Sequence, residues 1–193
     1  MKNIVVFCGA SPGLDPVYQE QAYLLGKIFA QESINLIYGG ANVGLMKAVA
    51  NGAMENGGKA TGVFPRFLSG LEVAHKGLTE LIIVETMHER KLKMHELSDA
   101  VIALPGGFGT LEELFEMLTW GQLGLHQKPI GILNLNGFYN ELLAMADKMV
   151  VTGFLKDSNR KMLITAETIP ALLDKIFEYK TDQGKQWITE EKT

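Results

Sequence analysis

The sequence holds too little cysteine, basic charge and continuous apolar sequence for several classes of protein. A single cysteine, Cys8, excludes an intrachain disulfide and a zinc cluster of thiolates. The chain has 18 Lys and Arg against 22 Asp and Glu, and a net charge of −4 argues against a general nucleic-acid-binding protein. No apolar run approaches the roughly 18 residues of a membrane span, and the run within residues 1–8 is too short for a signal peptide. We expect a soluble, cytoplasmic protein with neither nucleic acid nor membrane as a partner.

Metal-binding spacings are also missing. The four histidines, His75, His88, His95 and His126, form no His-x-x-x-His pair and no carboxylate-bearing metal motif. His88 and His95 share one predicted helix, but seven residues place them two turns apart, which is too far for a shared metal ion. We expect no metal and no resident cofactor.

What is present is an ordinary globular composition with an excess of glycine. Apolar residues make up 47% and charged residues 21% of the chain. A length of 193 residues favours one domain over 1–193, with a polar tail at 181–193 that we expect to be frayed. Glycine accounts for 21 residues, about 11% against a usual ~7%. The positions of these glycines are the main indication of function.

Short apolar runs alternate with segments of helical period along the whole chain. Strands are predicted at 4–8, 35–38, 60–64, 81–84, 100–104, 130–133 and 162–165. Helices are predicted at 16–31, 43–56, 87–97, 111–123, 138–150 and 169–180. This alternation predicts an α/β fold with a parallel sheet of about six or seven strands and helices on both faces.

Three glycine-bearing loops follow predicted strands, at 9–13, at Gly39-Gly40 and at 105–109. Ligands of parallel α/β sheets bind beyond the carboxyl ends of the strands. The three loops are therefore expected to converge on one binding site. Alone, Gly39-Gly40 can equally be a tight turn, and Ser11 in the first loop is a weaker candidate for a phosphate ligand.

The segment PGGFGTLEE at 105–113 carries the strongest signal. Its glycines let backbone N–H groups approach a ligand, and the start of the following helix attracts anions, so it is expected to bind phosphate. It is neither a Walker A loop nor a dinucleotide fingerprint, because the required Gly-Lys-Ser/Thr and third glycine are missing. The alternative is a structural helix start, since Thr110 and Glu113 have the spacing of a capping box.

The segment MHERKLKM at 87–94 places two cations on one helical face with two methionines. Cations in a first helical turn oppose the helix dipole, so Arg90 and Lys91 need a carboxylate or a bound anion if they are half-buried. The alternative is that their stems pack and their charged ends reach solvent. Thr86 and Glu89 fit a capping box, which makes Glu89 structural. Cys8 ends a predicted buried strand and is expected to belong to the core.

These paired motifs resemble the LOG ("Lonely Guy") family of cytokinin riboside 5′-monophosphate phosphoribohydrolases, from the loop after Cys8 to about Thr165. The resemblance implies a Rossmann-like three-layer fold, a homodimer with active sites near the interface, and hydrolysis of the N-glycosidic bond of an adenosine 5′-monophosphate, often N6-modified. It implies Arg90 and Glu113 as the catalytic pair. It implies substrate binding by Lys91, Gly106, Gly107, Phe108, Gly109, Thr110 and Thr119.

The chain departs from the family pattern at two places. Ala41 and Lys47 stand where the family often has glycine, in and after the second loop. Phe67 follows Pro65-Arg66 where plant members carry an acidic contact to the substrate, for which Glu72 is a candidate substitute. The first departure is not expected to abolish binding, because Lys47 lies in the predicted helix beyond the turn, whereas the second concerns the choice of base.

The residues suggest a mechanism together with its alternatives. The 107–110 loop would bind the 5′-phosphate with Ser11 and Gly40, and Glu113 would reach the ribose and activate water beside Arg90. A non-catalytic nucleotide carrier or sensor would retain the glycine loops but have no use for the Arg90–Glu113 pair. A lysine decarboxylase would need a lysine in a pyridoxal phosphate motif, which is missing. The apolar helix segment 114–118 is a candidate dimer interface.

Overall fold

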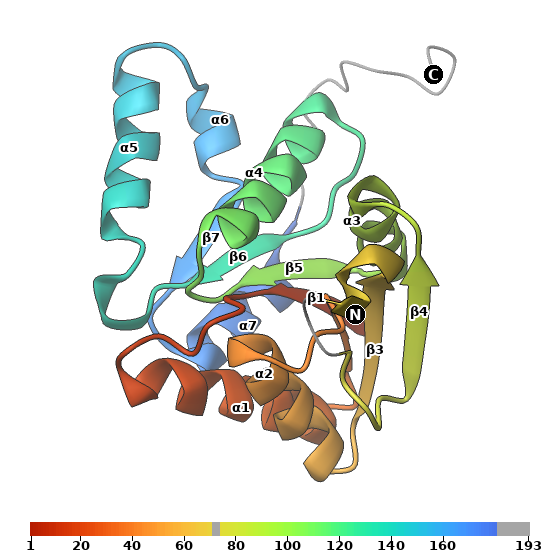
Figure 1. The fold of residues 1–193 in the computed structure, drawn as a ribbon. Helices are drawn as coiled ribbons and strands as arrows, with labels where there is room; N and C mark the ends of the chain where they lie inside the picture. The colour runs from red at the N-terminus through yellow and green to blue at the C-terminus, as the bar shows by residue number, and fades with distance from the viewer. Residues whose placement is uncertain (71–73, 181–193) are drawn as a thin grey trace.

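A computed structural model describes residues 1–70 and 74–180 of the chain. Seven strands form one sheet in the order β4-β3-β2-β1-β5-β6-β7, and every neighbouring pair is parallel (Figure 1). The strands are β1 (Asn3–Phe7), β2 (Asn35–Tyr38), β3 (Lys59–Pro65), β4 (Glu80–Val84), β5 (Ala100–Ala103), β6 (Ile130–Leu133) and β7 (Leu163–Ala166). This confirms the predicted three-layer α/β fold.

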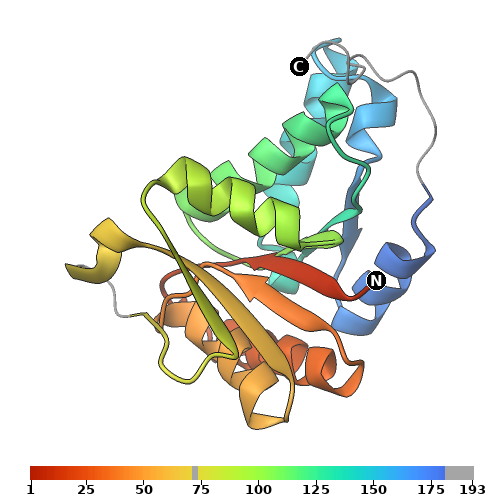
Figure 2. The same cartoon turned by 90° about the vertical axis from the view of Figure 1, so that its right-hand side faces the viewer.

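The helices cover both faces of the sheet (Figures 1 and 2). They are α1 (Pro16–Gln31), α2 (Gly44–Glu55), α3 (Met87–Leu97), α4 (Phe108–Leu123), α5 (Asn140–Val151), α6 (Asp157–Arg160) and α7 (Ile169–Glu178). One face packs against α1, α2 and α7, and the other against α3, α4 and α5. The strands β1, β5 and β6 are buried on both sides, which explains why they read as continuous apolar runs.

The strand order reverses at the centre of the sheet. The chain moves outward from β1 to β4 and then returns to lay β5 against the other side of β1. Val5 of β1 is paired with Ile37 of β2 and with Val101 of β5. Connections that leave in opposite directions open a crevice at the carboxyl ends of β1 and β5, where open α/β sheets bind their ligands.

Two glycines let α1 and α2 approach closely. A Cβ added at Gly26 of α1 would meet the carbonyl oxygen of Val49, and one at Gly52 of α2 would meet that of Tyr23. The helices therefore touch backbone to backbone, which fixes α2 and the loop before it relative to β1.

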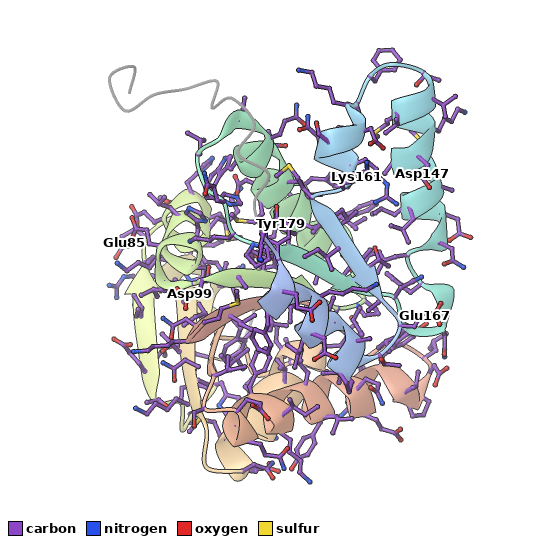
Figure 3. All side chains as sticks on the ribbon, turned by 180° about the vertical axis from the view of Figure 1, so that it is seen from behind. Glu85, Asp99, Asp147, Lys161, Glu167 and Tyr179 are labelled. Atoms are coloured by element: carbon purple, nitrogen blue, oxygen red, sulfur yellow. The ribbon has the colours of Figure 1, made fainter. Side chains whose placement is uncertain are left out.

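Most predicted boundaries agree with the structure within two residues, and two features differ. Helix α4 begins at Phe108 rather than at 111, because Gly107 is its N-cap. The four-residue helix α6 was not expected, because it is too short for an apolar period and buries none of its residues. Its ion pairs are those of Arg160 with Asp147 of α5 and of Lys161 with Asp157 (Figure 3 labels Asp147 and Lys161). No helix within the described residues is long and apolar enough to cross a membrane. The predicted tail, 181–193, lies outside the described residues, and the single domain stays a prediction.

Candidate active site

A cavity of about 500 Å³ opens at the carboxyl ends of the central strands. Its walls include the loop 9–13 after β1, Gly39 after β2 and the loop after β5. Apolar side chains from α2, the 3₁₀ turn Arg66–Gly70 and α3 complete the wall, among them Met46, Leu68 and Met87. The three glycine loops thus meet at one site, as their positions after strands predicted.

The start of α4 presents bare backbone to this cavity. No side chain caps the helix at Gly107, and a Cβ added at Gly107 or Gly109 would meet no atom within 4 Å. These two glycines are therefore not required for packing within the chain. Gly106 differs, because a Cβ there would meet the Thr110 hydroxyl and the Gly9 backbone. A helix N-terminus with uncovered N–H groups attracts anions such as phosphate.

The capping-box interpretation of Thr110 and Glu113 is wrong. Thr110 is the third residue of α4, buried behind Gly106, and the N-cap position belongs to Gly107. A capping box was also predicted at the start of α3, and the first of its two hydrogen bonds is present: the Glu89 N–H donates to Thr86 Oγ1. The return bond to the Glu89 carboxylate comes from the N–H of Glu85, one residue before the cap. Glu113 is therefore free of a capping role and faces the cavity.

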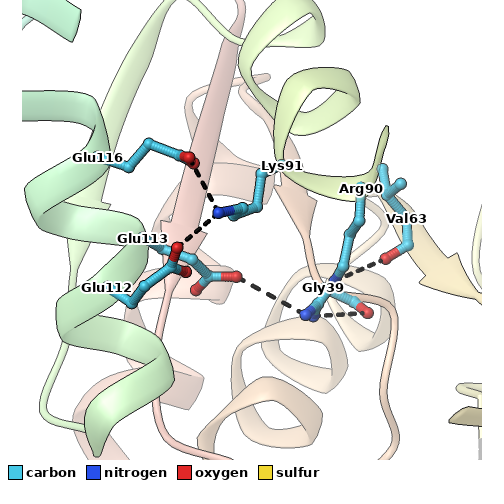
Figure 4. A network of polar contacts seen from close by, with 7 residues as sticks. All are labelled: Gly39, Val63, Arg90, Lys91, Glu112, Glu113 and Glu116. Carbon is cyan, nitrogen blue, oxygen red and sulfur yellow. Dashed lines mark hydrogen bonds and ion pairs between the residues drawn. The ribbon is translucent and has the colours of Figure 1, made fainter. Parts of the chain in front are cut away.

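Arg90 is buried on the cavity wall and is held by backbone carbonyls (Figure 4). Its Nε donates to the carbonyl of Val63 and its Nη2 to that of Gly39, both at 3.2 Å. Gly39 has no room for a side chain, because an added Cβ would coincide with the Arg90 guanidinium. The guanidinium end is thus held by β3 and by the residue that follows β2, and the side chain is only 10% exposed, which excludes the alternative of a solvated cation.

The remaining guanidinium nitrogen points to Glu113. Arg90 Nη1 lies 3.7 Å from Glu113 Oε1, and the side chains are 10% and 12% exposed. Burial raises the pKa of Glu113 to about 7, and the nearby charge of Arg90 limits the rise. A carboxyl group with a pKa near neutrality can exchange a proton with a substrate at physiological pH.

Lys91 is bound to α4, and one of its two partners, Glu112, lies on the cavity wall. Its Nζ donates to Glu112 Oε1 at 2.5 Å and to Glu116 Oε1 at 2.9 Å (Figure 4). These carboxylates are the partners that the half-buried cation required. Lys91 itself is not one of the residues that line the cavity in the described part of the chain.

The other predicted binding residues divide into two groups. Those on the cavity wall are Ser11, Gly106, Gly107, Gly109 and Thr110. Three others lie off the described wall, namely Gly40, Phe108 and Thr119. Phe108 is 93% exposed, Thr119 Oγ1 donates to the carbonyl of Phe115, and Gly40 is a tight-turn residue with φ of +77°. Glu72 lies outside the described residues.

Several wall residues escaped the sequence analysis. Tyr18 and Phe138 pack edge to face at 6.0 Å between ring centroids on one side of the cavity, and Met46 and Leu68 lie on its wall as well. These residues form no motif that the sequence analysis could recognise, because apolar residues in helices and turns normally fill the core. Cys8 is buried as expected, and burial raises the pKa of its thiol far above its usual range. Within 1–70 and 74–180, no group of three or more His, Cys, Asp or Glu could hold a metal ion.

Comparisons with known proteins identify relatives of this chain. Residues 46–176 match the model of a family described as "Possible lysine decarboxylase". The chain is 45% identical over 185 residues to a probable cytokinin riboside 5′-monophosphate phosphoribohydrolase of Oryza sativa subsp. japonica, covering 95% of this chain and 75% of the relative. It is 44% identical over 181 residues to a cytokinin riboside 5′-monophosphate phosphoribohydrolase of Arabidopsis thaliana, covering 94% and 83%.

Solved structures share the fold at lower identity. A molybdenum cofactor binding protein from Rippkaea orientalis has a TM-score of 0.68 at 25% identity, covering 92% of this chain and 96% of that one. A Moco carrier protein from Chlamydomonas reinhardtii has a TM-score of 0.68 at 20% identity, covering 91% and 97%. The matched family model and the plant relatives together show that this chain belongs to the LOG family.

Proposed function

We propose that the protein hydrolyses the N-glycosidic bond of adenosine 5′-monophosphate, plain or N6-modified, to free base and ribose 5-phosphate. The observation that carries the proposal is the buried Arg90–Glu113 pair beside the uncapped start of α4. The names of relatives at 42–45% identity support the same reaction. The residue roles given below are part of the proposal.

The 5′-phosphate is placed at the start of α4. Backbone N–H groups around Gly107 and Gly109 bind its oxygens, and Ser11 from the loop after β1 adds a hydroxyl. Glu113 lies four residues beyond Gly109, about 6 Å along the helix axis. A phosphate at the helix start therefore brings the attached ribose, rather than the base, next to the Glu113 carboxylate.

Glu113 acts on the sugar. Cleavage of an N-glycoside builds positive charge on the ribose, which a carboxylate stabilises while it orients or deprotonates the attacking water. With a pKa raised to about 7, Glu113 can accept that proton at neutral pH. Arg90 is fixed by two backbone carbonyls, so it can orient Glu113 and the nucleotide without moving.

A homodimer is part of this proposal. Leu114 and Met117 are buried in the core of the chain, so the interface expected from the whole segment 114–118 needs correction. The outward face of α4 instead carries the exposed side chains of Phe108 and Phe115 together with Thr119. A second copy packed on this face would come close to the cavity mouth and to two of the predicted binding residues.

The alternative is a nucleotide-binding carrier or sensor, which the likeness to cofactor-binding proteins of the same fold favours. Binding without chemistry needs the glycine loops alone. It does not require a carboxyl group held within 3.7 Å of a buried guanidinium. That pair favours the hydrolase.

Release of free base tests the proposal. The purified protein is incubated with AMP and with N6-isopentenyl AMP, and the free base is measured by chromatography. Glu113→Gln keeps the shape of the side chain and should reduce kcat by roughly 10²- to 10⁴-fold. Glu167→Gln, on an exposed residue that directly follows the edge strand β7 and lies off the described cavity wall (labelled in Figure 3), is the matched control and should retain the wild-type rate. Nucleotide binding without base release by the wild-type protein would support the carrier instead.

A further inference from the structure

Four side chains meet where the C-terminal ends of α3 and α4 come together with the loop 124–129. His95 lies in the last turn of α3, Trp120 in the last turn of α4, and His126 and Lys128 in the loop that leads to β6. The His95 ring packs edge to face on Trp120 at 5.2 Å and lies 5.0 Å from the His126 ring. We call these four the latch residues, and none of them is on the described cavity wall.

The hydrogen bonds of His126 require a neutral ring with its proton on Nε2. A carbonyl oxygen can only accept, so Nε2, 2.9 Å from the oxygen of Met117, must donate. A backbone N–H can only donate, so Nδ1, 3.1 Å from the nitrogen of Lys128, must accept. A protonated ring carries N–H at both nitrogens and would lose the bond from Lys128, which holds the loop beside α4.

His95 is neutral for a similar reason. The Lys128 ammonium group has no lone pair, so it must donate to His95 Nδ1 at 3.3 Å, and it also donates to the carbonyl oxygen of His95. The second bond places a positive charge at the C-terminal end of α3, where the helix dipole favours it. A proton on His95 Nδ1 would set two cations and two donors face to face, so it would break the link between α3 and the loop.

We propose that the latch residues form an acid-sensitive device, which joins α3, α4 and the loop 124–129 while both histidines are neutral and opens when they are protonated. The inference does not depend on the proposed reaction, because the latch lies off the described cavity wall. It concerns the opposite ends of the two helices that carry Arg90 and Glu113. An open latch would leave these helices without this contact between their C-terminal ends.

The charges around the latch oppose protonation of both rings. Burial and the charge of Lys128 hold the pKa of His95 at about 4, and His126 adds to this shift while Glu96 opposes it. Burial also lowers the pKa of His126, and Lys128 contributes in the same direction. Burial lowers the pKa of Lys128 itself, whereas Asp99 and Glu96 favour its charged form. The latch is therefore closed at neutral pH and opens only in acid.

The unfolded chain binds these protons first, because a free imidazole titrates near pH ~6.5. As pH falls from this value towards the lowered pKa values of the folded protein, His95 and His126 are charged in the unfolded chain and neutral in the folded one. The stability that the latch contributes is therefore present at neutral pH and is lost progressively in acid.

The first test follows the ring protons of the four histidines of the wild-type protein by NMR as pH is lowered. His75→Gln and His88→Gln each remove one resonance, so the two that remain in both spectra belong to His95 and His126. Both of these should titrate with a pKa below the usual ~6.5.

The same titration shows whether protonation opens the latch. The amide proton of Lys128, which donates to His126 Nδ1, should lose its protection from hydrogen exchange as the rings are protonated, after correction for the intrinsic effect of pH on exchange. The amide proton of Asn134 is the internal control. It lies just beyond the other end of β6, where it donates to the carbonyl of Ala166, and should stay protected.

The second test is the double variant His95→Gln/His126→Gln, whose side chains stay polar but take up no proton. Near pH ~5, unfolding of the wild-type protein should take up about one to two more protons than unfolding of this variant, so its urea midpoint should fall more steeply with acid. Contributions of Glu113 and other titrating groups are present in both proteins and cancel in the difference. His88→Gln, on an exposed residue of α3, is the matched control and should show the wild-type dependence.

Three results would overturn the inference. The first is that the ring protons of His95 and His126 titrate at or above ~6.5 in the folded protein. The second is that the Lys128 amide stays as protected as that of Asn134 after both rings are protonated. The third is an equal dependence of stability on pH in the wild-type protein and the double variant. If the double variant does not fold, the wild-type NMR titration decides, and absence of base release would reject the proposed function without touching the latch.

Discussion

At the scale of single residues, Glu113 is subject to two opposed effects. Burial disfavours its ionised form, and Arg90 at 3.7 Å favours it. Burial has the larger effect, so the folded protein binds a proton at Glu113 more tightly than the unfolded chain does. Burial of this carboxyl group therefore reduces stability at neutral pH.

The loss of stability should depend on pH in a definite direction. Between pH 4.5 and about 7, Glu113 is protonated in the folded protein and ionised in the unfolded chain, so the free energy of unfolding falls as pH rises. Glu113→Gln lacks this dependence. We expect the free energy of unfolding of Glu113→Gln, minus that of wild type, to increase by up to roughly 3 kcal/mol over this interval. Urea denaturation at several pH values measures it, and a difference that stays constant with pH would contradict the assignment.

The sequence predicted Arg90 and Glu113 as a pair, and the structure brings them together, but the direction of each side chain was not predicted. Residues 90 and 91 share one helical face, yet Arg90 turns to the carbonyls of Gly39 and Val63 while Lys91 turns to α4. Phe108 lies within the predicted phosphate motif and faces outward. Helical spacing predicts which side a residue is on, whereas the partners that it meets come from other strands and helices.

At the scale of helices and strands, hydrophobic periodicity and turn-forming residues were sufficient to predict most of the fold. Buried parallel strands are continuous apolar runs, and α3 carries its cap at Thr86. The start of α4 was expected three residues too late, because Phe108 and Gly109 are poor indicators of a helix and the N-cap Gly107 offers no side-chain signal. The aromatic and apolar cavity wall was not predictable, since it forms only when α1, α2 and α3 are brought together.

The contact between α1 and α2 gives a prediction about packing. Gly26→Ala and Gly52→Ala each place a Cβ against the backbone of the facing helix, so each should lower the free energy of unfolding by about 1–3 kcal/mol. Gln19→Ala, on the exposed side of α1, is the control and should change it by less than about 0.5 kcal/mol. Chemical denaturation of the three variants measures the difference, and equal stability of all three would show that the helices can move apart freely.

At the scale of the whole molecule, the order of the strands places the site. One reversal beside β1 gathers three loops, the start of α4 and the Arg90 face of α3 at a single crevice. Parallel α/β sheets bind ligands beyond the carboxyl ends of their strands, and this rule predicts the convergence from the sequence alone. The association of two copies does not follow from those rules, because it depends on which side chains remain exposed.

The proposed homodimer can be tested on that exposed surface. Sedimentation equilibrium should give twice the chain mass of 21.2 kDa for the wild-type protein. Phe115→Glu places a charge on the outward face of α4 and should yield monomers. Phe154→Glu changes an equally apolar, 89% exposed residue after α5 and should remain dimeric. A monomeric wild-type protein would reject the dimer.

The absence of a side chain at Gly39 has a consequence for the sequences of homologues. Because the Arg90 guanidinium occupies the space of a Cβ at Gly39, any side chain at that position requires the guanidinium to shift. A homologue that carries any side chain at the position of Gly39 must have moved or lost its arginine, whatever the rest of its motif looks like. This single alignment column should therefore separate, across genomes, the relatives that keep the arginine in this position from those that have kept only the fold.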